Sequence, residues 1–385
     1  MDADKQINQI TTNRDTTHKI PSSHLRTFAP VFVVLAAIFW GILVVFVRAF
    51  GQADFKSMEI VTLRVYSSAI FGWVFLLMFD RRSQRNATTN INTPDKKVTS
   101  GTANTRTTSV ATPAPHHFHL RDSWCFIGTG LVSIVFFSYC YFRNVEESSA
   151  AVAAILMYTS PIFVTLLSAI FFKEKLTKTK LLALLLAIIG CALVSGIASG
   201  IGTKSLLGIV SGIGTTPSPG AGGIVSPSFL GIALGLGSGI GYALYSIFGR
   251  FALDKGYSSF MVTAMTFTFA CVGVLPFIDI IGLVTRLITE PKYILLALVM
   301  GLVGSCTPFA LYTLGLRYME ASKAAILATL EPIVTALVGT FFYKEPIDIF
   351  VIVGIAMVLV AGILCSAKPQ DKPQIDPQDK PQPKP

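Results

Sequence analysis

Ten long apolar segments limit the possible fold of this chain more than any other feature of its sequence. A helix needs about 20 mainly apolar residues to cross roughly 30 Å of hydrocarbon, and each segment is close to that length. The segments run approximately over residues 28–48, 58–79, 122–142, 149–172, 179–199, 229–249, 258–281, 293–316, 321–343 and 348–366. In lipid every backbone N–H and C=O must be paired inside the protein, which a segment of this kind achieves as a helix. We therefore predict an all-α membrane protein with ten transmembrane helices.

The overall composition agrees with this prediction. Apolar residues make up 52 % of the chain and charged residues 14 %, with a mean hydropathy of +0.63. A soluble domain has nearer a quarter of its residues charged. The net charge of +10 would suggest nucleic acid only if the basic residues shared one folded surface. Because they lie mostly in tails and alternate loops, we expect a lipid bilayer as the partner and no nucleic acid.

One stretch of the sequence occurs twice. Residues 149–175 (SAAVAAILMYTSPIFVTLLSAIFFKEK) align without a gap to residues 320–346 (EASKAAILATLEPIVTALVGTFFYKEP). The matched pairs include Pro161 with Pro332, Lys173 with Lys344 and Glu174 with Glu345, all at a spacing of 171 residues. Each half holds five helices, an odd number, so the two copies must face opposite ways across the membrane. The predicted architecture is two inverted five-helix repeats.

The lysines and arginines predict the orientation. With the N-terminus in the cytosol, the cytosolic side holds 23 of them and the other side 7, with Arg64 left inside the second segment. Loops rich in Lys and Arg stay in the cytosol, so both termini are expected to be cytoplasmic.

Two repeats, two tails and two polar connections make up the predicted domain organisation. A linker rich in Thr, Asn, Ser and Pro cannot bury a core and is expected to be disordered. The predicted parts are a disordered cytosolic tail (1–27), the first repeat (28–199) with a disordered cytosolic linker (80–121), a Gly/Ser/Pro-rich external loop (200–228), the second repeat (229–366) and a disordered cytosolic tail (367–385).

Two ionisable side chains lie well inside predicted helices, and they are candidates for a solute site. A charge at membrane depth costs about 2.5–3.5 kcal/mol, so it usually has a function. Arg64 is about six residues into its helix and could instead reach the headgroups. Glu331 is nearer the middle, where a carboxylate could take up a proton, pair with a cationic solute, or hydrogen-bond a neighbouring helix.

Each repeat carries a proline in the middle of its fourth helix. Pro161 follows Ser160, and Pro332 follows Glu331. Proline removes one backbone donor and frees a carbonyl, so both helices are expected to break at mid-membrane, where a solute could be held. Ser160 is therefore a further candidate.

Aromatic residues on the same helices are candidates for the cavity wall, with core packing as the alternative for any one of them. Ring faces with polar tips suit amphipathic metabolites. The candidates are Trp40, Tyr139, Tyr158, Tyr242, Tyr245, Phe309 and Tyr312.

The sequence offers nothing for intramembrane catalysis. All five histidines lie outside the predicted helices, and no HExxH motif or pair of membrane aspartates occurs. The six cysteines lack metal-ligand spacing. We expect no catalytic residue, metal or cofactor, so an intramembrane enzyme is disfavoured, while a structural or receptor role is left open.

Several motifs resemble one family of carriers. The stretches SPIFVTLLSAIFFKEK and LRYMEASKAAILATLEPIVTALVGTFFYKEP, the pair Trp40-Gly41, and Arg64 within TLRVYSS are similar to the EamA family of the drug/metabolite transporter superfamily. The resemblance covers about residues 28–366 and departs from the family pattern at the charge-dense turn 143–147.

The resemblance implies a secondary transporter, often an exporter of amino acids or related metabolites, in the bacterial inner membrane. Its partners would be a small solute and, with Glu331, protons. A nucleotide-sugar or phosphorylated-sugar exchanger is the alternative within the superfamily. Anionic solutes call for several basic residues at depth, and the predicted helices offer only Arg64. Zwitterionic or weakly charged solutes are therefore favoured.

Overall fold

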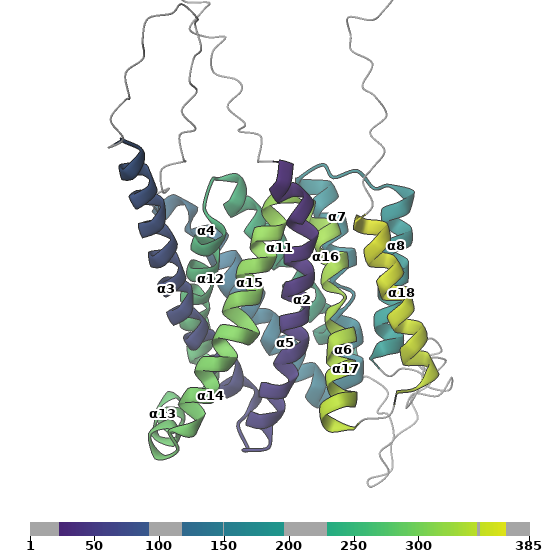
Figure 1. The fold of residues 1–385 in the computed structure, drawn as a ribbon. Coiled ribbons are helices and arrows are strands. Elements are labelled where there is room, and N and C mark those ends of the chain that lie inside the picture. Colours follow the sequence, from purple (N-terminus) through teal and green to yellow (C-terminus); the bar gives the residue numbers. More distant parts are fainter. Residues whose placement is uncertain (1–22, 92–117, 149, 196–228, 345–346, 367–385) are drawn as a thin grey trace, which may run out of the picture.

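The computed structural model describes residues 23–91, 118–148, 150–195, 229–344 and 347–366, and these form a bundle of helices without strands (Figure 1). The first half contains α2 (Ser23–Gly51), α3 (Ser57–Ile91), η1 (Leu120–Asp122), α4 (Ser123–Ile127), η2 (Gly128–Val135), α5 (Phe136–Glu147), α6 (Ala150–Met157), α7 (Ser160–Phe171) and α8 (Lys178–Val194). The second half contains α11 (Phe229–Asp254), α12 (Ser259–Val274), η3 (Leu275–Phe277), α13 (Ile280–Thr289), α14 (Lys292–Gly301), η4 (Leu302–Cys306), α15 (Thr307–Tyr318), α16 (Ala321–Ala328), α17 (Glu331–Tyr343) and α18 (Ile349–Ser366).

The all-helical membrane fold is confirmed. Within the described ranges, nine helices are long and apolar enough to cross a membrane. The remaining predicted segment, 179–199, contains α8, which has 17 residues and packs along α18. Large apolar side chains such as Ile170, Phe341 and Ile363 are 69–77 % exposed on the outside of the bundle, as lipid contact requires.

The ends of the bundle define two faces. We call the upper end of the bundle in Figure 1 the terminal face. It contains the first residue of α2, the last residues of α3 and α18, and η1. The α2–α3 turn and α13 lie at the opposite end, which we call the far face. The tails, most of the linker (92–117) and residues 196–228, which the sequence predicts to be disordered or in a loop, lie outside the described residues.

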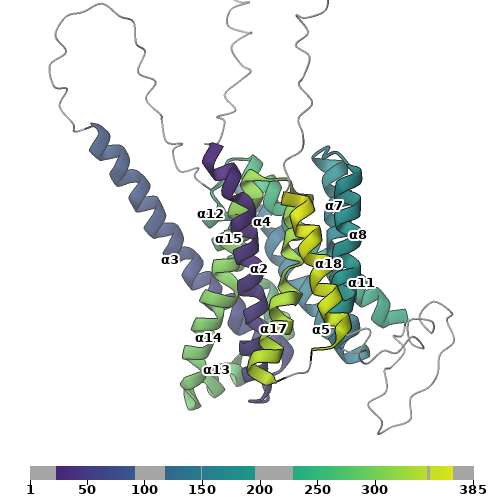
Figure 2. The same cartoon turned by 45° about the vertical axis from the view of Figure 1, so that its right-hand side comes forward.

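Two elements differ from the expected helix boundaries. α3 continues to Ile91, beyond the predicted end of its span at residue 79, and stands away from the bundle in Figure 2. Hydropathy marks where a helix leaves hydrocarbon, and a helix can continue into water past that point. α13 was not predicted; it is a short amphipathic helix with Ile281 and Ile288 exposed.

The repeats share backbone detail as well as sequence. The fourth span of each half is interrupted for two residues, between α6 and α7 and again between α16 and α17. The third span of each half contains a π-helical segment, η2 and η4. Lys173 and Lys344, aligned at the spacing of 171, both adopt left-handed backbone with φ of 55° and 56°. Three matched irregularities support the repeat independently of side-chain identity.

The core lies where α2, α11, α12 and α15 meet. Val33, Tyr245, Phe267 and Leu316, one from each of these helices, belong to a single cluster of buried apolar side chains. α11 also packs against α5, α6 and α7 of the first half, so it joins the two repeats at the centre of the bundle.

Candidate functional site

A small cavity lies at the centre of the bundle, between the two repeats. Its volume is about 60 Å³, roughly the space that two water molecules occupy in the liquid. The lining residues are Trp40, Leu43, Arg64, Ser133, Ile134, Phe137, Met157, Tyr242, Tyr245, Ser246, Phe309, Tyr312 and Glu331.

Seven of the ten candidate site residues line this cavity. They are Trp40, Arg64, Tyr242, Tyr245, Phe309, Tyr312 and Glu331. Tyr158 instead packs with Cys191 and Ile333 in a separate apolar cluster. Ser160 is buried at the start of α7 and does not line the cavity, and Tyr139 lines a different cleft.

Aromatic rings form one continuous wall of the cavity. Trp40 lies at the centre of this group, with ring centroids 5.1 Å from Phe309, 5.4 Å from Tyr312 and 6.2 Å from Tyr242. Tyr245 lies 4.8 Å from Phe309 in an edge-to-face arrangement. Such pairs fix the ring orientations and offer faces on which an apolar or cationic group can rest.

The tyrosine hydroxyls differ in their partners. Tyr245 and Tyr312 form hydrogen bonds with Thr313 (2.8 Å) and Ser246 (2.7 Å), so neutral protein groups satisfy them. Tyr242 donates to Oε2 of Glu331 over 3.4 Å. This long bond leaves the carboxylate with capacity for a further, stronger donor.

The first turn of α17 positions Glu331. The first part of this span, α16, ends at Ala328, and Glu331 is the first residue of α17, directly before Pro332. A helix N-terminus carries partial positive charge, which favours a carboxylate there. Discontinuous transmembrane helices hold solutes and ions at such mid-membrane ends in many transporters. In the first repeat the equivalent position is Ser160, so only the second half carries an acid.

Arg64 supplies the opposite charge. Its Nε is buried, and within the described part of the chain it has no hydrogen-bond partner. An unpaired guanidinium N–H costs free energy, and an oxygen of a bound solute would satisfy it. The cavity therefore combines one cation, one anion and an aromatic wall.

Sequence reasoning missed six lining residues. They are Leu43, Ser133, Ile134, Phe137, Met157 and Ser246. Two of these, Ser133 and Ile134, come from the π-helical segment η2, where the Ser133 hydroxyl donates to the carbonyl of Gly241 (2.7 Å). π-helical turns are frequent at functional sites. The glycines at 128 and 130 are the one sequence signal that marks this segment.

A larger cleft of about 260 Å³ opens on the far face. It lies between the start of α3, the end of α5 and the η3–α13 connection, and both acidic and basic side chains line it. Lys56 and Glu59 lie on its α3 side, and Arg143 and Glu146 on its α5 side. Met58 is six residues from Arg64 on α3, about 9 Å along a helix. Along α3, the cleft therefore lies nearer to the far face than the central cavity does.

Comparison with known proteins identifies the family. A family model described as "EamA-like transporter family" matches residues 27–196 and 229–367. The chain belongs to this family. It is a transporter and a multi-pass membrane protein, whose partners are the lipid bilayer and a small-molecule solute.

Relatives of this EamA protein carry the same general description. An uncharacterized transporter of Archaeoglobus fulgidus is 28 % identical over 226 residues, covering 59 % of this chain and 70 % of the relative. The uncharacterized transporter YwfM of Bacillus subtilis is 23 % identical, covering 66 % and 77 %. A solved structure described as "Crystal structure of protein" superposes with a TM-score of 0.58 at 13 % identity, covering 87 % of this chain and 95 % of the other. This last similarity shows the fold.

Two matched tyrosine variants test which side chains line the cavity. Tyr242→Phe removes the hydroxyl that contacts Glu331, and the lost bond to a charged group should weaken transport about tenfold. Tyr158→Phe makes the same chemical change outside the cavity and should alter flux less than about twofold. Initial rates of solute flux in proteoliposomes provide the measurement. Equal losses in both variants would contradict the cavity boundary described above.

Proposed function

We propose that this EamA protein is a secondary transporter that exports small zwitterionic metabolites such as amino acids by alternating access. One observation carries the proposal: Arg64 and Glu331 line the same aromatic cavity at the end of a broken helix. A solute carboxylate would pair with Arg64 and its ammonium group with Glu331, while the rings would hold its side chain. Glu331 would also serve as a proton carrier when no cationic group is bound.

The size of the cavity supports a mechanism with alternating states. About 60 Å³ is too small for an amino acid, so the rings and the helices that carry them have to separate before a solute binds. Inverted repeats provide that motion, because each half can adopt the arrangement of the other around a fixed central site. In an exporter of this orientation, the far-face cleft is then the path by which the solute leaves in one of the two states.

The charge balance disfavours the nucleotide-sugar alternative. Arg64 is the one basic residue among those that line the central cavity. A diphosphate carries at least two negative charges and would also face the carboxylate of Glu331. Recognition of such a solute calls for several basic donors around the phosphates.

The proposed setting is the bacterial inner membrane, with both termini in the cytosol. The distribution of lysine and arginine supports this orientation. The terminal face would then be the cytosolic face. Under this orientation, export moves solute from the terminal face to the far face.

Flux measurements with a panel of solutes test the function. Purified protein in liposomes would be given labelled amino acids and nucleotide sugars, with and without a pH gradient. We expect saturable amino-acid flux that responds to the gradient. Exchange of nucleotide sugars without amino-acid flux would overturn the solute class, and flux that does not respond to the gradient would remove the proton from the mechanism.

A further inference from the structure

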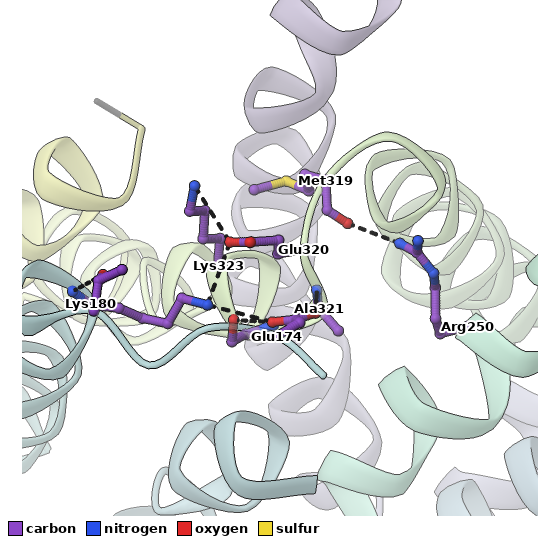
Figure 3. A network of polar contacts seen from close by, with 9 residues as sticks. Glu174, Lys180, Arg250, Met319, Glu320, Ala321 and Lys323 are labelled. Atoms are coloured by element: carbon purple, nitrogen blue, oxygen red, sulfur yellow. Dashed lines mark hydrogen bonds and ion pairs between the residues drawn. The ribbon is translucent and has the colours of Figure 1, made fainter. Parts of the chain in front are cut away.

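A cluster of charged residues joins the two repeats at the terminal face. Figure 3 shows Glu174, from the turn after α7, between Lys180 on α8 and the start of α16. Lys180 Nζ lies 3.5 Å from Glu174 Oε2 and 3.3 Å from Glu320 Oε2. Lys323 Nζ also lies 3.3 Å from Glu320. The side chains of Lys180 and Glu174 are only 3 % and 9 % exposed.

Glu174 also caps a helix that belongs to the other repeat. Its carboxylate accepts hydrogen bonds from the backbone N–H groups of Ala321 (2.8 Å) and Ser322 (3.3 Å), and from the Ser322 hydroxyl. These donors are the unpaired N–H groups at the start of α16, where a negative charge is most favourable. The contact therefore combines a helix cap with an ion pair across the interface between the repeats.

The left-handed backbone conformation of Lys173 directs Glu174 toward the start of α16. With φ of 55° at Lys173, the chain reverses after α7, and the N–H of Glu174 bonds back to the carbonyl of Ser168 (3.3 Å). This is the geometry of a helix C-cap, which fixes the direction of the residue that follows. Glu174 is held in position by backbone structure, before any ion pair forms.

The far face lacks most of the equivalent residues. At the spacing of 171, Glu174 corresponds to Glu345, so the capping acid is present in both repeats. The other four residues of the cluster have uncharged equivalents: Val351 for Lys180, Ser149 for Glu320, Ala151 for Ser322 and Val152 for Lys323. An inverted repeat with equal halves would make equal contacts on both faces. Here only the terminal face has the residues for the full cluster.

Other contacts between the repeats are weaker or are not related by the repeat. Asp122 pairs with Lys255 at 2.7 Å on the terminal face, and this hydrogen bond raises the pKa of Lys255 above its usual value, but Lys255 is 39 % exposed. The exposed ammonium group contributes little as an ion pair, while Asp122 also accepts a hydrogen bond from the Tyr257 hydroxyl at 2.9 Å. On the far face, Arg286 donates to the carbonyls of Ala53 and Asp54. That contact joins α13 to the α2–α3 turn and leaves the 260 Å³ cleft beside it open.

We propose that Glu174, Lys180, Glu320, Ser322 and Lys323 form a one-sided latch that holds the terminal face closed and makes this the resting state of the carrier. The inference rests on the proposed alternating access. Opening the terminal face would separate Glu174 from the N-terminus of α16 and expose two buried charges. On the far face the positions equivalent to Lys180, Glu320 and Lys323 carry no charge, so we expect the two states to differ in stability without any solute.

Distance measurements on both faces test the latch. Spin labels at Thr179 and Arg317 span the terminal face, and labels at Lys56 and Glu146 span the far-face cleft, in a background without the six native cysteines. Glu174→Gln should lengthen the first distance and shorten the second, each by on the order of 5 Å. Asp254→Asn is the matched control, because it makes the same acid-to-amide change on this face in a pair confined to α11.

The outcomes separate a latch from a local helix cap. Opposite changes on the two faces in Glu174→Gln, with none in Asp254→Asn, would support the latch. No change, or a lengthened terminal distance with an unchanged far distance, would overturn it, because a cap alone acts only locally. Both measurements need no solute. A carrier with no amino-acid flux could therefore still show the latch, and a carrier with flux could lack it.

Hydrogen exchange provides a second measurement with the native cysteines in place. In Glu174→Gln, peptides containing Ala321 and Ser322 should exchange about tenfold faster, as expected for a lost hydrogen bond to a charged group. Peptides from the start of α3, which lines the far cleft, should exchange more slowly if that cleft closes. Faster exchange at α16 with unchanged exchange at α3 would contradict the proposal.

Discussion

Glu331→Gln is expected to reduce amino-acid flux by at least about 100-fold while leaving a folded protein. Truncating one partner of a buried charge pair costs about 2–5 kcal/mol, and glutamine cannot replace the charge that a solute ammonium group would meet. The substitution keeps the size of the side chain, so the aromatic wall around Trp40 and Tyr242 should stay in place. The measurement is flux into proteoliposomes, with thermal unfolding of the detergent-purified protein as the check on folding.

The matched control for this prediction is Glu290→Gln. Glu290 pairs with Lys292 at 2.8 Å on the far face, where both side chains are 40 % or more exposed. Loss of an exposed pair should change neither flux nor stability appreciably. If Glu331→Gln retained wild-type flux, Glu331 would be a structural residue that bonds Tyr242, and the proposed solute contact would be wrong.

Gly130→Ala is expected to lower the free energy of unfolding by about 3 kcal/mol, the upper part of the range for overpacking. A Cβ at Gly130 would lie 2.4 Å from the carbonyl oxygen of Thr266 and 2.9 Å from the backbone N of Ala270. Both are backbone atoms of α12, so the clash cannot be relieved by turning a side chain. The two helices would have to separate by a sizeable fraction of an ångström.

Gly237→Ala is the control for this packing prediction. Its added Cβ would meet Cys140 Sγ at 3.4 Å, which is an ordinary contact. In the interior of α11, alanine is also the better helix former, so stability should stay equal or rise. Thermal unfolding of both variants in one detergent compares them directly. Equal unfolding temperatures would show that α12 shifts easily and that the contact at η2 does not limit packing.

The depth of the site could be predicted from the sequence, because charges and prolines are rare within apolar segments. Arg64 and Glu331 stood out for that reason, and the aligned prolines placed the interruptions in the fourth span of each repeat. The aromatic residues of α11 and α15 followed from their positions at the same depth, and four of them line the cavity.

The direction of each side chain around its helix could not be predicted in the same way. Tyr158 lies in the two-residue break between α6 and α7, where the helical phase is interrupted, and it contacts Cys191 and Ile333 instead of the cavity. The π-helical segment η2 likewise shifts the phase of the third span, bringing Ser133 and Phe137 to the cavity. Periodicity counted from the sequence assumes a regular helix, and both sites depart from one.

The aromatic filling of the central cavity also bears on what the protein keeps out. Aromatic rings pack around a space of only about 60 Å³, which leaves little room for water at the middle of the bundle in this state. An ion crossing there would have to exchange most of its hydration shell for contacts with aromatic rings and with Arg64 or Glu331. We therefore expect the carrier without solute to conduct few ions, which the conductance of a bilayer that contains the protein would measure.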